Sequence, residues 1–91
     1  MKTRRFSTTL VRHQGVANGW VFATIPAAHA PPVTRGWGRT PVRATVDGHT
    51  WNTSVWRSKN GSSVLAVPKH IRGGKGDGDK VRVEITFDPE D

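Results

Sequence analysis

The chain has 91 residues, of which 34% are hydrophobic, and it contains four Trp, three Phe and no Cys. This length supports one modest core, so we expect a single domain over residues 1–91 with frayed tails at 1–5 and 89–91. The absence of cysteine excludes disulfides, cysteine-ligated zinc and thiol nucleophiles. No segment has the pattern of a signal peptide or a membrane span, so a cytoplasmic location is expected.

The positive charge is concentrated in the first half of the chain. The formal net charge is +7, and every acidic residue lies at or after Asp47. Residues 1–46 therefore hold all of the excess positive charge. This asymmetry indicates a surface that faces a polyanion, although a genome that favours arginine codons would also raise the charge without selection for binding.

Two strands and a short helical turn are predicted at the start of the chain. Residues 6–10 alternate between apolar and polar side chains, and residues 20–25 form a second β-type run. Pro26 ends that strand and can begin a helical turn over residues 27–30. Residues 33–40 are rich in Gly and Arg, which predicts an exposed loop.

Four more strands are predicted after this loop, over residues 42–46, 50–56, 63–67 and 81–87. The pair Asp47-Gly48 separates the first two of them and predicts a tight hairpin turn. Pro68 closes the third strand and opens a second helical turn that extends to residue 72.

The two halves of the chain form an internal repeat when residues 50–87 are laid over residues 6–46. Pro26 then falls on Pro68, and each half contains two strands, a turn that begins at proline, and a third strand. Neither half can bury its apolar side chains alone. We therefore predict a mainly β fold, a small closed pseudo-symmetric barrel of about six strands with two short helical turns.

Several short segments also follow one another in the order of a known family. They are the strand at Phe6, Ile25-Pro26, Val42–Gly48, Trp51–Trp56, Val67-Pro68, Ile71-Arg72 and Gly78-Asp79-Lys80-Val81. Together they resemble the bacterial family named domain of unknown function 1905 (DUF1905) over roughly residues 6–88. The most specific parts are the Asp47-Gly48 turn, the nearby Thr53-Ser54-Val55, and the segment 68–81.

The resemblance implies a double-split β-barrel, related in shape to small transition-state-regulator and antitoxin domains that bind DNA. The chain departs from the family pattern at residues 73–76, which replace a longer helical turn, and at Pro31-Pro32, which shorten the first helix. Some members continue into a second domain associated with bacteriocin protection and the regulation of outer-membrane proteins. Because this chain ends at Asp91, the barrel is expected to stand alone.

No catalytic residue, metal ligand or cofactor site is predicted. The histidines lie in separate turns without the spacing of metal ligands, at His13, His29, His49 and His70. No Ser, His and carboxylate set has the spacing of a hydrolase, and the glycine-rich segment 73–79 lacks the pattern of a P-loop. We therefore expect that the chain is not an enzyme.

The predicted ligand-binding residues are Arg35, Trp37, Arg39 and Arg43, because all four lie in or beside the predicted loop of the basic half. Arginine neutralises phosphate groups, and an exposed aromatic ring stacks on unpaired bases. For Trp37, which lies between two glycines, a role in binding and a role in anchoring the loop are both open.

The predicted function is a non-enzymatic binding module with nucleic acid as its ligand. The alternative is an accessory protein that binds an acidic protein or peptide through a barrel edge or the Trp37 loop, in a context similar to bacteriocin protection. An enzyme would need a concave site with titratable groups from several strands. No membrane partner is expected, and a monomer is favoured.

Overall fold

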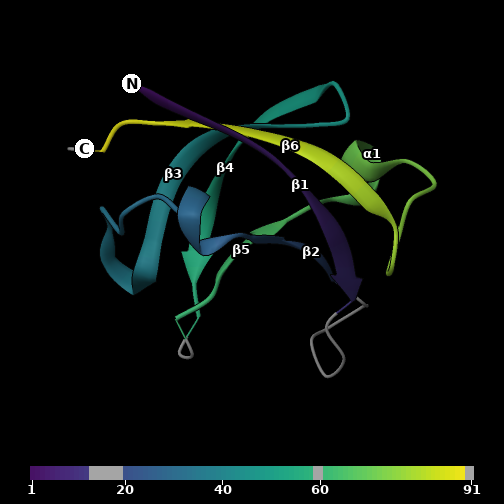
Figure 1. Ribbon diagram of the computed structural model, residues 1–91, viewed down its shortest axis with the longest axis horizontal. Coiled ribbons are helices and arrows are strands. Elements are labelled where there is room, and N and C mark those ends of the chain that lie inside the picture. The colour runs from purple at the N-terminus through teal and green to yellow at the C-terminus, as the bar shows by residue number, and fades with distance from the viewer. Residues whose placement is uncertain (13–19, 59–60, 90–91) are drawn as a thin grey trace.

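The computed structural model describes residues 1–12, 20–58 and 61–89, and Figure 1 shows their arrangement. The strands are β1 (Lys2–Arg12), β2 (Val21–Ile25), β3 (Arg39–Val46), β4 (His49–Arg57), β5 (Ser63–Ala66) and β6 (Lys80–Phe87). The short helices are the 3-10 turns η2 (Ala27–His29) and η3 (Gly36–Gly38) and the helix α1 (Lys69–Arg72). The predicted mainly β fold with six strands is confirmed, and the two predicted helical turns correspond to η2 and α1.

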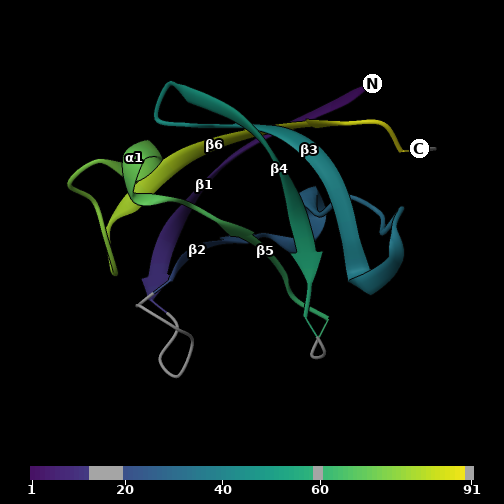
Figure 2. The same cartoon turned by 180° about the vertical axis from the view of Figure 1, so that it is seen from behind.

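The strands form a closed antiparallel barrel in the order β1-β2-β5-β4-β3-β6, and β6 pairs again with β1. This order does not change when β1 is exchanged with β4, β2 with β5, and β3 with β6. The register obeys the same exchange, because Leu10 pairs with Ala23 in the first half while Val55 pairs with Leu65 in the second. Figures 1 and 2 show both chain ends at the same end of the long β1–β6 pair.

The core is built from alternate residues of all six strands. Along β6, for example, Val81, Val83, Ile85 and Phe87 are buried and the intervening side chains face outward. Leu10, Leu65 and Ile85 are fully buried and come from both halves of the chain. Each such side chain contributes about 1.5–3 kcal/mol through its removal from water, so neither half is stable without the other.

The hairpin between β3 and β4 turns at Asp47 and Gly48. Their φ values are 47° and 88°, in the left-handed region that a two-residue type I′ turn requires at both positions. Aspartate tolerates this region better than most residues, and glycine has no Cβ to clash. The turn predicted from these two residues is therefore confirmed.

Two predicted boundaries are wrong. Residues 2–5 are not frayed, because Lys2 to Arg5 continue β1 and pair with the last four residues of β6, up to Lys2 with Phe87. β3 begins at Arg39, inside the segment that was predicted as a loop, because Arg39 pairs with Trp56 on β4. The predicted fraying of 89–91 concerns residues that, after Pro89, lie outside the described part of the chain.

Candidate functional site

Arg39 and Arg43 lie on the outer face of β3. The residues that alternate with them, Thr40, Val42 and Ala44, are buried in the barrel. Because side chains along a strand point alternately to its two faces, the two arginines project to the same side, about 13 Å apart along the strand. Arg43 is flanked by Asn52 of β4 and Thr86 of β6, so it stands in the middle of a polar row.

Arg35 is held beside the start of β3 by the backbone. Its N–H donates to the carbonyl oxygen of Arg39 at 2.8 Å, and the N–H of Thr34 donates to the same oxygen at 3.3 Å. The structure therefore places Arg39 and Arg43 on one face of β3 and holds the backbone of Arg35 beside the start of that strand. The fourth predicted binding residue, Trp37, lies in η3 between Arg35 and Arg39, and its side chain is outside the part that the structure describes.

Trp56 is a candidate that the sequence interpretation missed. It pairs directly with Arg39 across the β3–β4 ladder, and 42% of its surface is exposed. Directly opposed residues of antiparallel strands have neighbouring side chains on the same face, so this tryptophan stands next to a cation. Alternation along β4 could have shown from the sequence that Trp56 faces away from buried Val55. Only the strand register shows that Arg39 lies beside Trp56.

Strands β2 to β5 give Arg39 and Arg43 a positive setting, while Glu84 of β6, opposite Thr45, lies diagonally from Arg43 and is paired with Arg5. No Asp or Glu occurs in the sequences of β2, β3, β4 or β5. Within the described residues, neither arginine has an acidic partner at ion-pair distance. Two guanidinium groups on one face of a strand, neither paired with a carboxylate among the described residues, form a surface that attracts anions.

Two basic side chains near β1 and β6 are paired with acidic ones. The Nε of Arg5 on β1 lies 2.5 Å from Oε1 of Glu84 on β6, and Nζ of Lys75 lies 2.6 Å from Oδ2 of Asp47. These pairs neutralise part of the positive charge on that side of the barrel. Arg39 and Arg43 on β3 have no such pair among the described residues.

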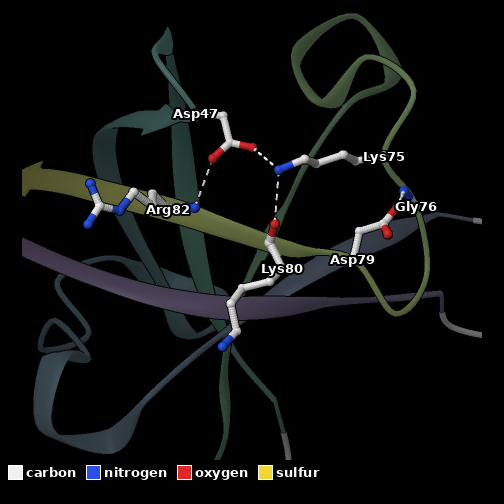
Figure 3. A network of polar contacts seen from close by, with 6 residues as sticks. All are labelled: Asp47, Lys75, Gly76, Asp79, Lys80 and Arg82. Atoms are coloured by element: carbon white, nitrogen blue, oxygen red, sulfur yellow. Dashed lines mark hydrogen bonds and ion pairs between the residues drawn. The ribbon is translucent and has the colours of Figure 1, made fainter.

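Asp47 organises the polar network of Figure 3. Its Oδ1 accepts the backbone N–H of Arg82 at 2.9 Å, and Lys75 donates both to its Oδ2 and, at 3.0 Å, to the carbonyl oxygen of Lys80. The hydrogen bond from Lys75, followed by that from Arg82, lowers the pKa of Asp47 below its ordinary value. Lys75 therefore ties the glycine-rich segment to the β3–β4 turn.

The glycine-rich segment 73–79 forms turns that lead into β6. The N–H of Gly76 donates to Oδ2 of Asp79 at 2.8 Å, and the N–H of Arg12 donates to Oδ1 of Asp77, also at 2.8 Å. Aspartates in glycine-rich turns often satisfy backbone donors in this way. Both carboxylates thus hold the backbone around the start of β6.

An open groove of about 540 Å³ lies across β1, β6 and the β3–β4 turn. Two carboxylates line it, and both already have partners: Glu84 is paired with Arg5, and Asp47 is bound by Lys75 and the Arg82 amide. Both carboxylates therefore accept hydrogen bonds or ion pairs from neighbouring groups of the chain.

The described residues hold neither a cluster of metal-binding side chains nor a helix that could cross a membrane. No group of three or more His, Asp or Glu side chains is arranged to hold a metal ion there. No helix in the same ranges has the length and hydropathy needed to cross a membrane. The feature with a clear chemical capability is the arginine and tryptophan surface on β3 and β4, which can bind anions and flat rings.

The chain matches a protein family over most of its length. No curated protein matches the chain. The family described as Domain of unknown function (DUF1905) matches residues 6–85, from the middle of β1 almost to the end of β6. The match covers nearly the whole barrel, including β3 and β4, and the chain therefore belongs to the DUF1905 family.

Proposed function

We propose that this chain is a small nucleic-acid-binding module that acts by binding and not by catalysis. Its contact surface is the outer face of β3 and the segment before it, where Arg35, Arg39 and Arg43 present positive charge. The observation that carries the proposal is that Arg39 and Arg43 share one face without an acidic partner among the described residues. Such arginines neutralise phosphates and release counterions, which supplies affinity without sequence preference.

An acidic protein or peptide is the alternative ligand, because the same arginines would attract it. The closed strand order limits how it could bind, because each strand already pairs with two others, although β4 pairs with β5 only over residues 55–57. A peptide could therefore add backbone pairing only along a short stretch of edge, and most of its contacts would be to side chains. The regular spacing of phosphates along a nucleic acid makes nucleic acid the better match to a row of arginines on a strand.

Fluorescence anisotropy tests the proposal. Labelled single-stranded and double-stranded DNA and RNA are titrated with the wild-type chain and with the triple variant Arg35→Ala, Arg39→Ala, Arg43→Ala. The control is the triple variant Lys2→Ala, Lys69→Ala, Lys80→Ala, which removes the same charge from β1, α1 and β6. We expect the arginine variant to lose about tenfold or more in affinity at low salt, and the lysine variant to lose much less.

Either of two results would contradict the proposal. The absence of binding by the wild type at low salt would remove nucleic acid as the ligand. Equal losses in the two triple variants would mean that net charge alone attracts the nucleic acid and that the β3 face has no special role.

A further inference from the structure

The outer face of β2, β5 and β4 carries exposed aromatic and aliphatic side chains. Trp20, immediately before β2, is 52% exposed, Trp56 on β4 is 42% exposed, and Val11 on β1 is 40% exposed. Tryptophan is rarely this accessible in a small domain, because it removes more apolar area from water than other residues when buried. Two exposed tryptophans on the same side of the barrel, one just before β2 and one on β4, therefore call for an explanation.

The register joins these residues into one strip. Phe22 of β2 pairs with Val11 on one side and with Ala66 of β5 on the other. Two residues from Ala66 on the same face of β5, Val64 pairs with Trp56 of β4, and Trp56 in turn pairs with Arg39 of β3. Figure 2 shows β2, β5, β4 and β3 following one another across the molecule. We call this surface, from Trp20 and Phe22 through Val64 and Ala66 to Trp56, the aromatic strip.

The rings at the two ends of the aromatic strip are positioned differently. Trp20 is stacked on Phe22, with ring centroids 6.2 Å apart and an angle of 23° between the planes, which holds one face of Trp20 against the barrel. Trp56 is opposite Val64 of β5 and, through it, level with Thr24 of β2, so it lies about 12 Å from Phe22, two strand spacings across and two residues along. It stands next to Arg39. Small aliphatic side chains fill the interval, so no long side chain of β5 covers the rings.

The charge around the aromatic strip determines which class of ligand can bind there. The four strands that form this side of the barrel contain no acidic residue, and the strip borders directly on Arg39 and, further along β3, Arg43. A ligand that matches this surface must have flat apolar faces and negative charge close to them. Unpaired bases on a phosphate backbone have this combination, since bases stack on aromatic rings while phosphates contact arginine.

We infer that the aromatic strip binds single-stranded nucleic acid, with bases stacked on Trp56 and Trp20 and phosphates held by Arg39 and Arg43. This inference rests on the proposed function and narrows it to one class of ligand. The bases of a duplex are already stacked on each other, so they offer no free faces to the rings. Reading a duplex through its major groove would need a longer helix than α1, which has four residues, or a ribbon such as the β3–β4 hairpin, so the duplex probe tests that second route directly.

The test compares single-stranded and double-stranded probes of the same sequence. The labelled probes are dT15, rU15 and a duplex of about 15 base pairs that contains the dT15 strand. Each is titrated with the wild type, Trp20→Ala, Trp56→Ala and the double variant Arg39→Ala/Arg43→Ala. Trp51→Phe is the control, because Trp51 lies on the same strand as Trp56 but packs against the core. Trp56→Phe keeps a stacking ring and checks that any loss comes from stacking and not from a disturbed strand.

Each tryptophan-to-alanine change is expected to weaken binding of the single-stranded probes by about fivefold or more, without changing the salt dependence. Binding of the duplex should not change, Trp51→Phe should bind like the wild type, and Trp56→Phe should retain most of the affinity. Quenching of tryptophan fluorescence by unlabelled dT15 should decrease in both alanine variants, because their stacking rings are gone.

Two results would overturn the inference, and they are distinguishable from failure of the proposed function. If the arginine variant loses affinity while both tryptophan variants bind single strands like the wild type, nucleic acid binds on β3 without the aromatic strip. If the tryptophan variants weaken duplex and single strand equally, the strip does not select unpaired bases. If no probe binds in an arginine-dependent way, the proposed function itself is wrong.

Discussion

Asp47 and Arg82 are joined by two hydrogen bonds, one between their backbones and one from the Arg82 backbone to the Asp47 side chain. The N–H of Asp47 donates to the carbonyl oxygen of Arg82 at 3.0 Å, and the N–H of Arg82 donates to Oδ1 of Asp47 at 2.9 Å. β3 ends at Val46, and the Asp47 side chain then supplies the acceptor that the next strand residue would have given to β6. One carboxylate thus continues the ladder beyond the end of the strand.

The stability of the barrel should depend on the ionisation of Asp47. Its pKa is lowered by the Lys75 hydrogen bond and then by the Arg82 N–H, so the folded state binds this proton less readily than the unfolded state. The stabilisation is therefore complete above the unfolded pKa, near 3.8, and is lost as the pH falls through the lower folded value. Asp47→Asn keeps the turn and an acceptor oxygen but removes the charge.

We expect Asp47→Asn to cost up to about 1 kcal/mol near neutral pH, the usual range of a solvent-exposed pair. The difference between wild type and variant should shrink at about pH 3. Urea unfolding at the two pH values measures it. A difference that is the same at both would show that the charge of Asp47 contributes nothing. Asp47→Ala, which also loses the acceptor and the tolerance of positive φ, should be less stable at either pH.

Gly38 should be far less tolerant of substitution than Gly36, although both flank Trp37. Gly38 has φ of 69°, and a Cβ there would lie 3.0 Å from the carbonyl oxygen of Arg57. At Gly36 nothing lies within 4 Å of the added atom. Gly38→Ala is expected to lower the free energy of unfolding by about 1–3 kcal/mol, and Gly36→Ala to change it by less than about 0.5 kcal/mol. Equal effects in denaturant titrations would contradict this account of η3.

Leu10 and Val11 are neighbours on β1 with opposite surroundings. Leu10 is fully buried in the barrel, whereas Val11 is exposed on its outer face. Leu10→Ala should destabilise the fold by about 2–5 kcal/mol, because it removes buried methyl groups and leaves a cavity. Val11→Ala should have an effect below about 1 kcal/mol. Thermal unfolding followed by circular dichroism compares them, and a Val11 effect as large as that of Leu10 would contradict the observed orientation of β1.

Arg43 and Arg5 should differ in their contribution to nucleic-acid binding. Both are exposed, but Arg5 is paired with Glu84 while Arg43 has no acidic partner among the described residues. Arg43→Ala should reduce the slope of log affinity against log salt by about one, the value for one lost phosphate contact. Arg5→Ala should change it much less. If the two variants give the same slope, the ion pair of Arg5 does not decide which arginine contacts phosphate.

The sequence supports prediction of the strands because their buried faces alternate strictly. The pattern along Val81–Phe87 defines the inner face of β6, and Asp47-Gly48 defines a turn, from local chemistry alone. Lys2–Arg5 have no apolar alternation, so their place in β1 depends on β6, a partner at the other end of the chain. Local pattern carries no signal for such a strand, because the hydrogen bonds that form it come from distant residues.

Part of the candidate site could likewise be predicted from the sequence, and part depends on how the strands pair. Arg39 and Arg43 are an even number of residues apart, so a strand through them puts both on one face. The pairing of Arg39 with Trp56 and the continuation from Trp56 to Val64 depend on strand order and register. The aromatic strip therefore could not be assembled from the sequence, although each of its residues is visible there.

The pairing of β1 with β6 also constrains how the chain folds. Lys2 finds its partner, Phe87, only after nearly the whole chain has been synthesised, and the β3–β6 pair likewise waits for the last strand. Contacts between residues so distant in sequence give a high contact order, which slows folding because the loop-closure entropy is lost before the contacts form. Until β6 forms, β1 lacks its longest neighbour and β3 lacks one of its two partners. The docking of β6 is therefore the step that closes the barrel and pairs these strand edges.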